Sequence, residues 1–156
     1  MHIYIMRHGQ AQMMASSDAQ RALTSIGIEQ SARMAQYMRS KNVVFDALML
    51  SPYLRAQQTW RSVCDYFPKV AHQQTVKMLT PSGSVHKTLT EIFSLQAQGI
   101  KTVLLISHLP LVGYLVSELA PQSAVCAFST SSIAHIELNE QGSGQLVSMT
   151  AVSHLS

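Results

Sequence analysis

Residues 2–10 read HIYIMRHGQ, an apolar run that ends in an arginine, a histidine and a glycine. The run His2–Met6 predicts a buried strand, because near-continuous apolar runs are typical of sheets that are covered on both faces. Two later runs, Ala47–Leu50 and Val103–Ile106, have the same character. A helical pattern follows each of the three, so we expect a mainly parallel sheet.

The remaining segments complete this arrangement. We expect helices at Ile26–Ser40 (capped by Thr24, with Ala32, Met34, Ala35 and Met38 inward), from Ser51-Pro52 to about Phe67, at Val85–Gln98 and at Pro110–Leu119. Two last apolar runs, Ile133–Leu138 and Gln145–Met149, flank the turn sequence NEQGSG and predict an antiparallel hairpin at the sheet edge. The order predicts an α/β fold, a three-layer α/β/α sandwich around a mainly parallel sheet with an antiparallel edge. We expect one domain over residues 1–156.

Composition narrows the classes of function. The chain has a formal net charge of +3 but no run of lysine or arginine, so we expect no binding to nucleic acid. Its two cysteines, Cys64 and Cys126, belong to no metal-ligand pattern and are expected to be buried thiols in a reducing cytosol. The apolar segment 102–120 has the length of a membrane span, but its internal serine, histidine, proline and glutamate favour a buried strand and helix. We therefore expect a cytoplasmic protein that does not bind membranes.

Candidate functional residues follow the ends of the three predicted strands. Ligands of parallel sheets bind beyond the carboxyl ends of the strands, where this chain has Arg7, His8, Arg55 and His108. The helix that is expected to begin at Pro110, next to Leu109, adds free backbone N–H groups at the same edge. Such a site suits an anion with several oxygens, which indicates a phosphoryl group.

The residue types suggest roles. Arginine gives planar, bidentate hydrogen bonds to phosphate oxygens and stays charged. A neutral imidazole such as that of His8 is a competent nucleophile toward phosphorus, and nearby guanidinium groups oppose its protonation. Gly9 allows the backbone to turn sharply and approach a ligand closely.

Four segments in order, MRHGQ, LTSIG, SPYLRAQQT and ISHLPLVGYL, resemble the histidine phosphatase superfamily, whose fold is phosphoglycerate-mutase-like. Within it they are similar to the short SixA-type phosphohistidine phosphatases, and the likeness runs from residue 1 to about residue 138. The resemblance implies that His8 is transiently phosphorylated and that Arg7, Arg55 and His108 hold the phosphoryl oxygens. It places Arg21 near the mouth of the site, and we count Leu109 with the phosphate-binding residues. It implies no metal or other cofactor.

One expected feature of many relatives is missing. Esterases and mutases of the superfamily supply a carboxylic acid to protonate the departing alcohol, yet residues 66–90 contain no Asp or Glu. The chain is also too short for a cap insertion. An imidazole leaving group can take a proton on its own ring, so an uncapped site without an acid fits a phosphohistidine on a protein surface.

Three functions are therefore compared. The first is a phosphohistidine phosphatase, a hydrolase that acts on a phosphotransfer (HPt-type) domain or a phosphotransferase carrier, and we expect it to be a monomer. The second is a phosphomonoesterase for a small metabolite, with Asp18 or Glu91 as the acid. The third is a module that only binds phosphohistidine. The first is favoured, because a pure binder needs no nucleophile. Met13 and Met14, which follow the nucleophile, are candidates for a protein-docking surface.

Overall fold

The computed structural model of the chain describes residues 1–124 and 127–155. Its centre is a six-stranded sheet with the strand order β3-β2-β4-β1-β5-β6. The strands are β1 (His2–Arg7), β2 (Ala47–Leu50), β3 (His72–Thr75), β4 (Thr102–Ser107), β5 (Ile133–Leu138) and β6 (Gly144–Thr150). The first four are parallel, while β5 is antiparallel to β1 and β6 is antiparallel to β5. The predicted α/β fold class, with its antiparallel edge, is confirmed.

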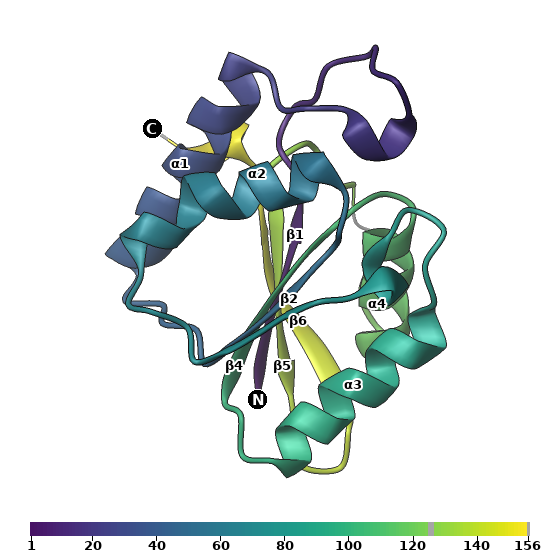
Figure 1. The fold of residues 1–156 in the computed structure, drawn as a ribbon. Coiled ribbons are helices and arrows are strands. Elements are labelled where there is room, and N and C mark those ends of the chain that lie inside the picture. Colours follow the sequence, from purple (N-terminus) through teal and green to yellow (C-terminus); the bar gives the residue numbers. More distant parts are fainter. Residues whose placement is uncertain (125–126, 156) are drawn as a thin grey trace.

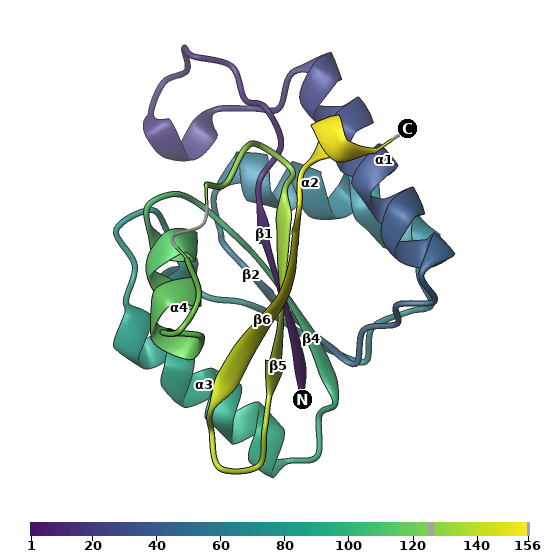
Figure 2. The ribbon, with the colours of Figure 1, turned by 180° about the vertical axis from the view of Figure 1, so that it is seen from behind.

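Two pairs of helices cover the two faces of the sheet (Figure 1). They are α1 (Ser25–Ser40) and α2 (Leu54–Val63) on one face, and α3 (Val85–Ala97) and α4 (Leu111–Leu119) on the other. Figure 2 shows the same layers from behind. The alternation of side chains along β1 explains both layers: Ile3 and Ile5 belong to the core beneath α3 and α4, and Met6 belongs to the core beneath α1 and α2.

The first helix starts as its sequence predicts. The hydroxyl of Thr24 accepts a hydrogen bond from the backbone N–H of Gly27 at 3.0 Å, which caps α1. Met34, Ala35 and Met38 are buried on its inner face as expected. Ala32 is only half-buried, because the helix presents Ser31 to the interior at that level instead.

The second helix differs from its prediction. It begins at Leu54 with Tyr53 as the N-cap residue, and a short 3-10 turn, Cys64–Tyr66, follows its end at Val63. Ser51 does not cap it, because the Ser51 hydroxyl contacts the ring of His108 at 2.7 Å. The prediction that the cysteines are buried is wrong for Cys64, which is a free and only partly buried thiol, and Cys126 lies outside the described residues.

The apolar segment 102–120 forms β4 and α4, as its polar residues predict. No helix in the described ranges is long and apolar enough to cross a membrane. The segment between β1 and α1 lies beyond the carboxyl end of β1, at the top of Figure 1. An isolated antiparallel bridge between Ala11 and Leu23 closes this loop at its base. We call residues 12–22 the rim loop.

Candidate active site

His8 lies just beyond β1, near the middle of the sheet, and is 6% exposed. Its backbone N–H donates to Ser107 O at 3.0 Å, and the backbone N–H of Ser131 donates to both Arg7 O and His8 O. Gly9 follows in close contact with α1: a Cβ atom there would lie 2.7 Å from Gly27 O. The turn after β1 therefore requires glycine, and this turn holds the imidazole of His8 at the carboxyl end of the strand.

Hydrogen bonding fixes which nitrogen of His8 carries the proton and which carries the lone pair. Nδ1 lies 2.7 Å from Gly9 O, and a carbonyl oxygen can only accept, so Nδ1 carries the proton. The lone pair is then on Nε2, which receives a hydrogen bond from Arg55 Nε at 3.3 Å. Burial and the nearby arginine charges lower the pKa of His8 to about 4, although the Gly9 hydrogen bond acts in the opposite direction. The ring is thus neutral at neutral pH and presents an available nucleophilic nitrogen.

Arg55 is the cation nearest to this nitrogen. It is 4% exposed and lies in the first turn of α2, with its guanidinium 5.1 Å from the ring centre of Tyr53. Thr59, one turn later, donates to Arg55 O at 2.7 Å and accepts from the Gly9 N–H at 2.9 Å. These two bonds tie the turn after β1 to the helix that carries the arginine.

Arg7 and His108 approach the same end of the sheet from neighbouring strands. Arg7 Nη1 donates to Phe128 O at 2.9 Å, while Arg7 Nε is buried without a hydrogen-bond partner. The rings of His8 and His108 lie 5.1 Å apart between centroids. His108 Nε2 contacts Ser51 Oγ, and His108 Nδ1 is likewise buried and without a partner. Burial, followed by the neighbouring His8 and Arg55, lowers the pKa of His108 to about 3.

Unpartnered buried nitrogens are uncommon in folded proteins, and an acceptor supplied by a bound group is one explanation for them. Here they belong to two residues that the sequence assigned to phosphate binding. A tetrahedral oxyanion would supply acceptors for Arg7 Nε and His108 Nδ1, with further oxygens for Arg55. The side chains therefore fit a phosphoryl group.

Asp18, in the rim loop, contacts Arg55, which lies 37 residues away along the chain. Its Oδ2 pairs with Arg55 Nη2 at 3.2 Å, its Oδ1 pairs with Arg21 Nη1 at 3.0 Å, and its carbonyl oxygen accepts from Arg55 Nη1 at 2.7 Å. The hydrogen bond from Arg21, with that from Arg55, lowers the pKa of Asp18. Asp18 is thus an ionised acceptor at neutral pH. Sequence reasoning named it only as a possible acid and gave no sign of this contact.

Arg21 lies outside the group that surrounds His8. Its Nε donates to Gln12 O at 2.7 Å and its guanidinium pairs with Asp18, so it acts on the site through that carboxylate and through its charge. Glu91, the other candidate acid, is held elsewhere by Gln74 Nε2 at 3.0 Å.

The helix α4 starts one residue later than expected, and the prediction that its first N–H groups serve the site stays a prediction. The helix begins at Leu111, and the Val112 N–H is already donated to His108 O. Leu109 has a side chain that is 41% exposed, beside the buried His108. The Leu109 side chain has no hydrogen-bonding group, so a phosphate-binding role of this residue stays a prediction.

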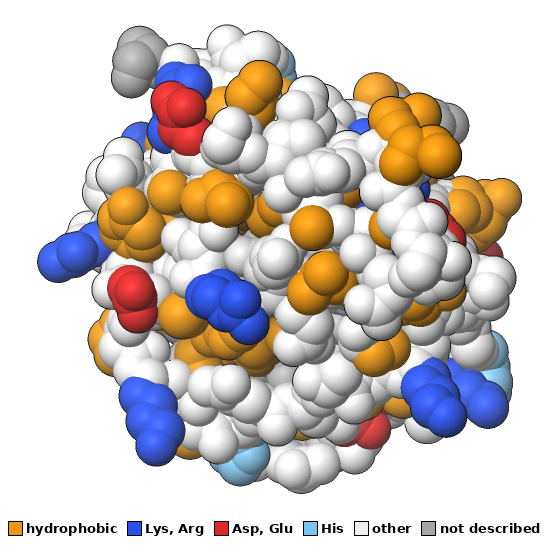
Figure 3. Space-filling view, turned by 45° about the horizontal axis from the view of Figure 1, so that its top comes forward, with side chains coloured by type: hydrophobic (Ala, Val, Ile, Leu, Met, Phe, Trp, Pro, Cys, Tyr) orange, Lys and Arg blue, Asp and Glu red, His pale blue; other side chains and the backbone are white. Residues whose placement is uncertain are grey.

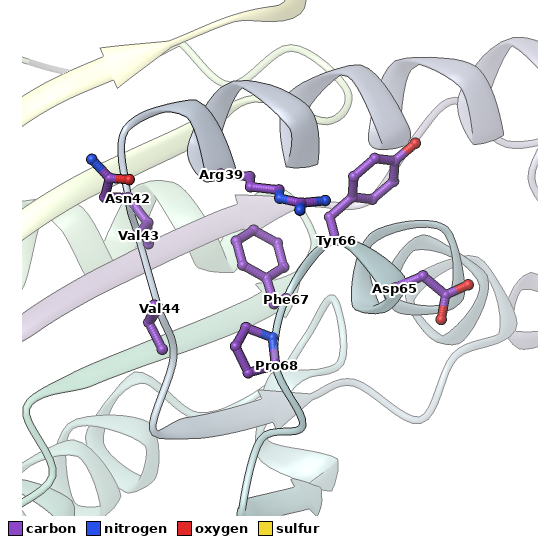
Figure 4. A pocket seen from close by; sticks show the side chains of 8 residues that line it. All are labelled: Arg39, Asn42, Val43, Val44, Asp65, Tyr66, Phe67 and Pro68. Carbon is purple, nitrogen blue, oxygen red and sulfur yellow. The ribbon is translucent and has the colours of Figure 1, made fainter.

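Two surface hollows have different relations to the site. One of about 310 Å³ is lined by Met13, Met14, Ala15, Ser17, Asp18 and Arg21, and so adjoins it. Another of about 440 Å³ lies between the end of α1 and the turn after α2, and Figure 4 shows the side chains that line it, from residue 39, residues 42–44 and residues 65–68. The second hollow contains none of the predicted site residues. Among the described residues, no group of three or more His, Cys, Asp or Glu could hold a metal ion.

The fold and this arrangement define a class of protein, and the chain belongs to the histidine phosphatase superfamily. The sequence family called histidine phosphatase superfamily (branch 1) matches residues 3–79 of this chain. In sequence the chain is similar to Phosphohistidine phosphatase SixA of Escherichia coli (strain K12), at 41% identity over 144 residues that cover 92% of this chain and 89% of that protein. It is 36% identical over 143 residues to the SixA homolog of Haemophilus influenzae, with 87% of each chain covered.

Solved structures agree. The structure of the protein histidine phosphatase SixA complexed with tungstate matches with a TM-score of 0.96 and 38% identity, and all of both chains is covered. A putative α-ribazole-5′-P phosphatase from Escherichia coli matches with a TM-score of 0.75 at 18% identity, which shows the shared fold alone.

Proposed function

We propose that this protein hydrolyses the phosphorus–nitrogen bond of a phosphohistidine carried by another protein, such as an HPt-type domain or a phosphotransferase carrier. The observation that carries the proposal is the state of His8: a neutral ring, fixed by Gly9 O so that its Nε2 lone pair faces Arg55. The likeness to phosphohistidine phosphatases, one of which binds tungstate, supports it. Tungstate is a tetrahedral oxyanion like phosphate.

The reaction has two displacements at phosphorus. In the first, His8 Nε2 forms a bond to phosphorus, the substrate's P–N bond breaks, and its electron pair returns to the departing imidazole, which carries a proton on its other nitrogen. Arg7, Arg55 and His108 hold the three phosphoryl oxygens and stabilise the charge that they carry in the transition state. As the new bond forms, the Arg55 Nε–H loses the His8 lone pair as its acceptor and donates its hydrogen bond to a phosphoryl oxygen instead.

In the second displacement a water oxygen attacks phosphorus and the His8 P–N bond breaks. The electron pair returns to Nε2, and the proton of the water passes to the phosphate. In both steps His8 Nδ1 keeps its proton and donates a hydrogen bond to Gly9 O, so breaking the P–N bond restores His8 as a neutral imidazole. Neither step requires an acid from the protein, because both leaving groups are neutral rings.

The alternative of a small-metabolite phosphomonoesterase requires a carboxylic acid at the leaving oxygen. Asp18 contacts Arg55, but its two arginine partners keep it ionised, and an ionised carboxylate has no proton to give. Glu91 is held by Gln74. A module that only binds phosphohistidine is disfavoured, because the Gly9 contact prepares His8 to attack.

The open surface next to the site suits a protein substrate. Met13 and Met14 are 83% and 84% exposed on the rim loop, and the hollow that they line includes Asp18 and Arg21. Figure 3 shows hydrophobic side chains spread in separate groups over this side of the molecule, with basic groups more evident than acidic ones. Flexible methionines adapt to a partner surface.

A substrate panel with a trapped intermediate tests the proposal. Rapid acid quench should be avoided for the trapped species, because phosphohistidine is labile in acid; a denaturing quench at alkaline pH followed by mass spectrometry should find one phosphoryl group on His8. Hydrolysis of a histidine-phosphorylated protein should be much faster than that of an alkyl phosphate. Among esters, log rate should fall steeply as the pKa of the leaving group rises. A flat dependence with fast alkyl phosphate hydrolysis would replace the proposal by the phosphomonoesterase.

A further inference from the structure

Ser51 is a buried hydroxyl at the carboxyl end of β2, directly behind His108. Its side chain is 0% exposed, and Ser51 Oγ lies 2.7 Å from His108 Nε2. The backbone N–H of Tyr53 also donates to Ser51 Oγ, at 3.3 Å. The hydroxyl thus has a donor on one side and an imidazole nitrogen on the other.

The number of protons decides the direction of the Ser51–His108 bond. A hydroxyl has one proton to give, and a neutral imidazole has one N–H and one lone pair. If Ser51 donates to Nε2, the proton of His108 is on Nδ1, and every group of this pair except the Nδ1–H has a partner. If Nε2 donates instead, the Ser51 proton has no described acceptor and Nδ1 is a buried bare lone pair. The first arrangement leaves fewer buried groups unsatisfied, so it is favoured.

The unsatisfied group of the favoured arrangement has a use. The Nδ1–H of His108 is buried in a ring that lies 5.1 Å from the ring of His8. A donor there can bond to an oxygen of the transferred phosphoryl group without carrying a charge. The opposite tautomer would turn a lone pair toward that oxygen, which would repel it.

We propose that Ser51 is a positioning residue that fixes the tautomer of His108, so that the Nδ1–H of His108 is donated to the phosphoryl group. The inference rests on the proposed phosphoryl transfer for its purpose, but the tautomer itself can be observed without turnover. Ser51 acts only through His108.

The first test is the tautomer of His108 in 15N-histidine-labelled protein, measured by long-range proton–nitrogen correlation with the signal assigned by the His108→Ala variant. The wild-type protein should show the Nδ1–H form. Ser51→Thr keeps the hydroxyl and should retain it, whereas Ser51→Ala should move His108 toward the Nε2–H form. Ser107→Ala is the matched control, because Ser107 is equally buried but donates to Leu79 O at 2.7 Å. An Nε2–H form in the wild-type protein would overturn the proposal without any variant.

The second test is binding of tungstate, measured by calorimetry, in a double-mutant cycle. Ser51→Ala should weaken tungstate binding on the order of tenfold in the wild-type background, as expected for loss of a preorganised donor to an oxyanion. The same change should have no effect in the His108→Ala background, because the donor is already gone. Equal effects in both backgrounds would show that Ser51 acts independently of His108 and would contradict the proposal. Absence of phosphohistidine phosphatase activity, with the tautomer and the cycle as expected, would refute the proposed function alone.

Discussion

Replacing Asp18 by asparagine removes a negative charge that lies beside Arg55 and Arg21 at the entrance of the site. Asparagine has nearly the same shape, and the contact of the Asp18 carbonyl oxygen with Arg55 belongs to the backbone, so it survives the change. What is lost is the charge that pairs with Arg55 at 3.2 Å and with Arg21 at 3.0 Å. In the present structure this carboxylate occupies part of the fork that a phosphoryl group would use.

The structure sets the size of the effect. The Asp18 side chain is 54% exposed, although that of Arg55 is only 5% exposed. Because solvent reaches the carboxylate, the pair is assigned the strength of a partly exposed ion pair, ~0.2–1 kcal/mol. An incoming anion must displace the pair with Arg55. Removing that competition should therefore strengthen binding of free phosphate by about 1.4- to fivefold.

Competitive inhibition by inorganic phosphate, with an aryl phosphate as substrate, measures this effect. Asp18→Asn should have the lower inhibition constant, and the difference should shrink at high salt, because exposed charges are screened. Asp65→Asn, on the turn after α2, is the control that changes the same charge elsewhere. Unchanged or weaker inhibition by phosphate in Asp18→Asn would refute the competition. A loss of alkyl phosphate turnover by about a hundredfold or more would instead identify Asp18 as a general acid.

Three further predictions concern Arg55, the exposed Met13 and Met14, and His8. Arg55→Ala should lower kcat on the order of a hundredfold or more, and Arg55→Lys should lower it less, because lysine keeps the charge but cannot form two parallel hydrogen bonds. Arg39→Ala, on the surface of α1, is the control and should leave kcat nearly unchanged. Near-normal kcat in Arg55→Ala would show that Arg55 does not belong to the site. Replacing Met13 and Met14 by serine should slow turnover of a histidine-phosphorylated protein and spare a small phosphoramidate, and equal losses on both would argue against docking. The pKa of His8 is about 4 in the folded protein and about 6.5 in the unfolded chain, so His8 lowers the stability of the fold as pH falls from about 6.5 to about 4 and adds no further loss below that. For the same reason kcat/KM should stay level down to about pH 5 before it falls. A pH–rate profile that drops between pH 7 and pH 6 would contradict the lowered pKa of His8.

The strands of the core could be predicted closely from the sequence. Ala47–Leu50 is a strand with the expected bounds, because all four side chains are buried and the sequence shows this as an unbroken apolar run. The edge strand His72–Thr75 has no such signal, because three of its four residues are exposed and all are polar. Periodicity reports burial, and an exposed edge has little of it.

The candidate site was predictable in its residues and not in its connections. His8, Arg55 and His108 follow strand ends, and topology brings strand ends together whatever the loops do. The Asp18 contact depends on how the rim loop folds back over α2, and no local pattern encodes that path. The start of α2 was misplaced for a similar reason, because Ser51 is engaged by a histidine 57 residues away instead of by its own helix.

The bridge between Ala11 and Leu23 gives the rim loop the character of an exchangeable part. It joins the two ends of the loop directly, while His8 comes before it and Thr24, the N-cap residue of α1, comes after it. Segments of other lengths can then be grafted between these two anchors without altering the path of β1 or the start of α1. Recombining such loops among relatives would therefore change partner choice together with the Asp18 contacts to Arg55, while Arg7, His8 and His108 lie outside the exchanged segment.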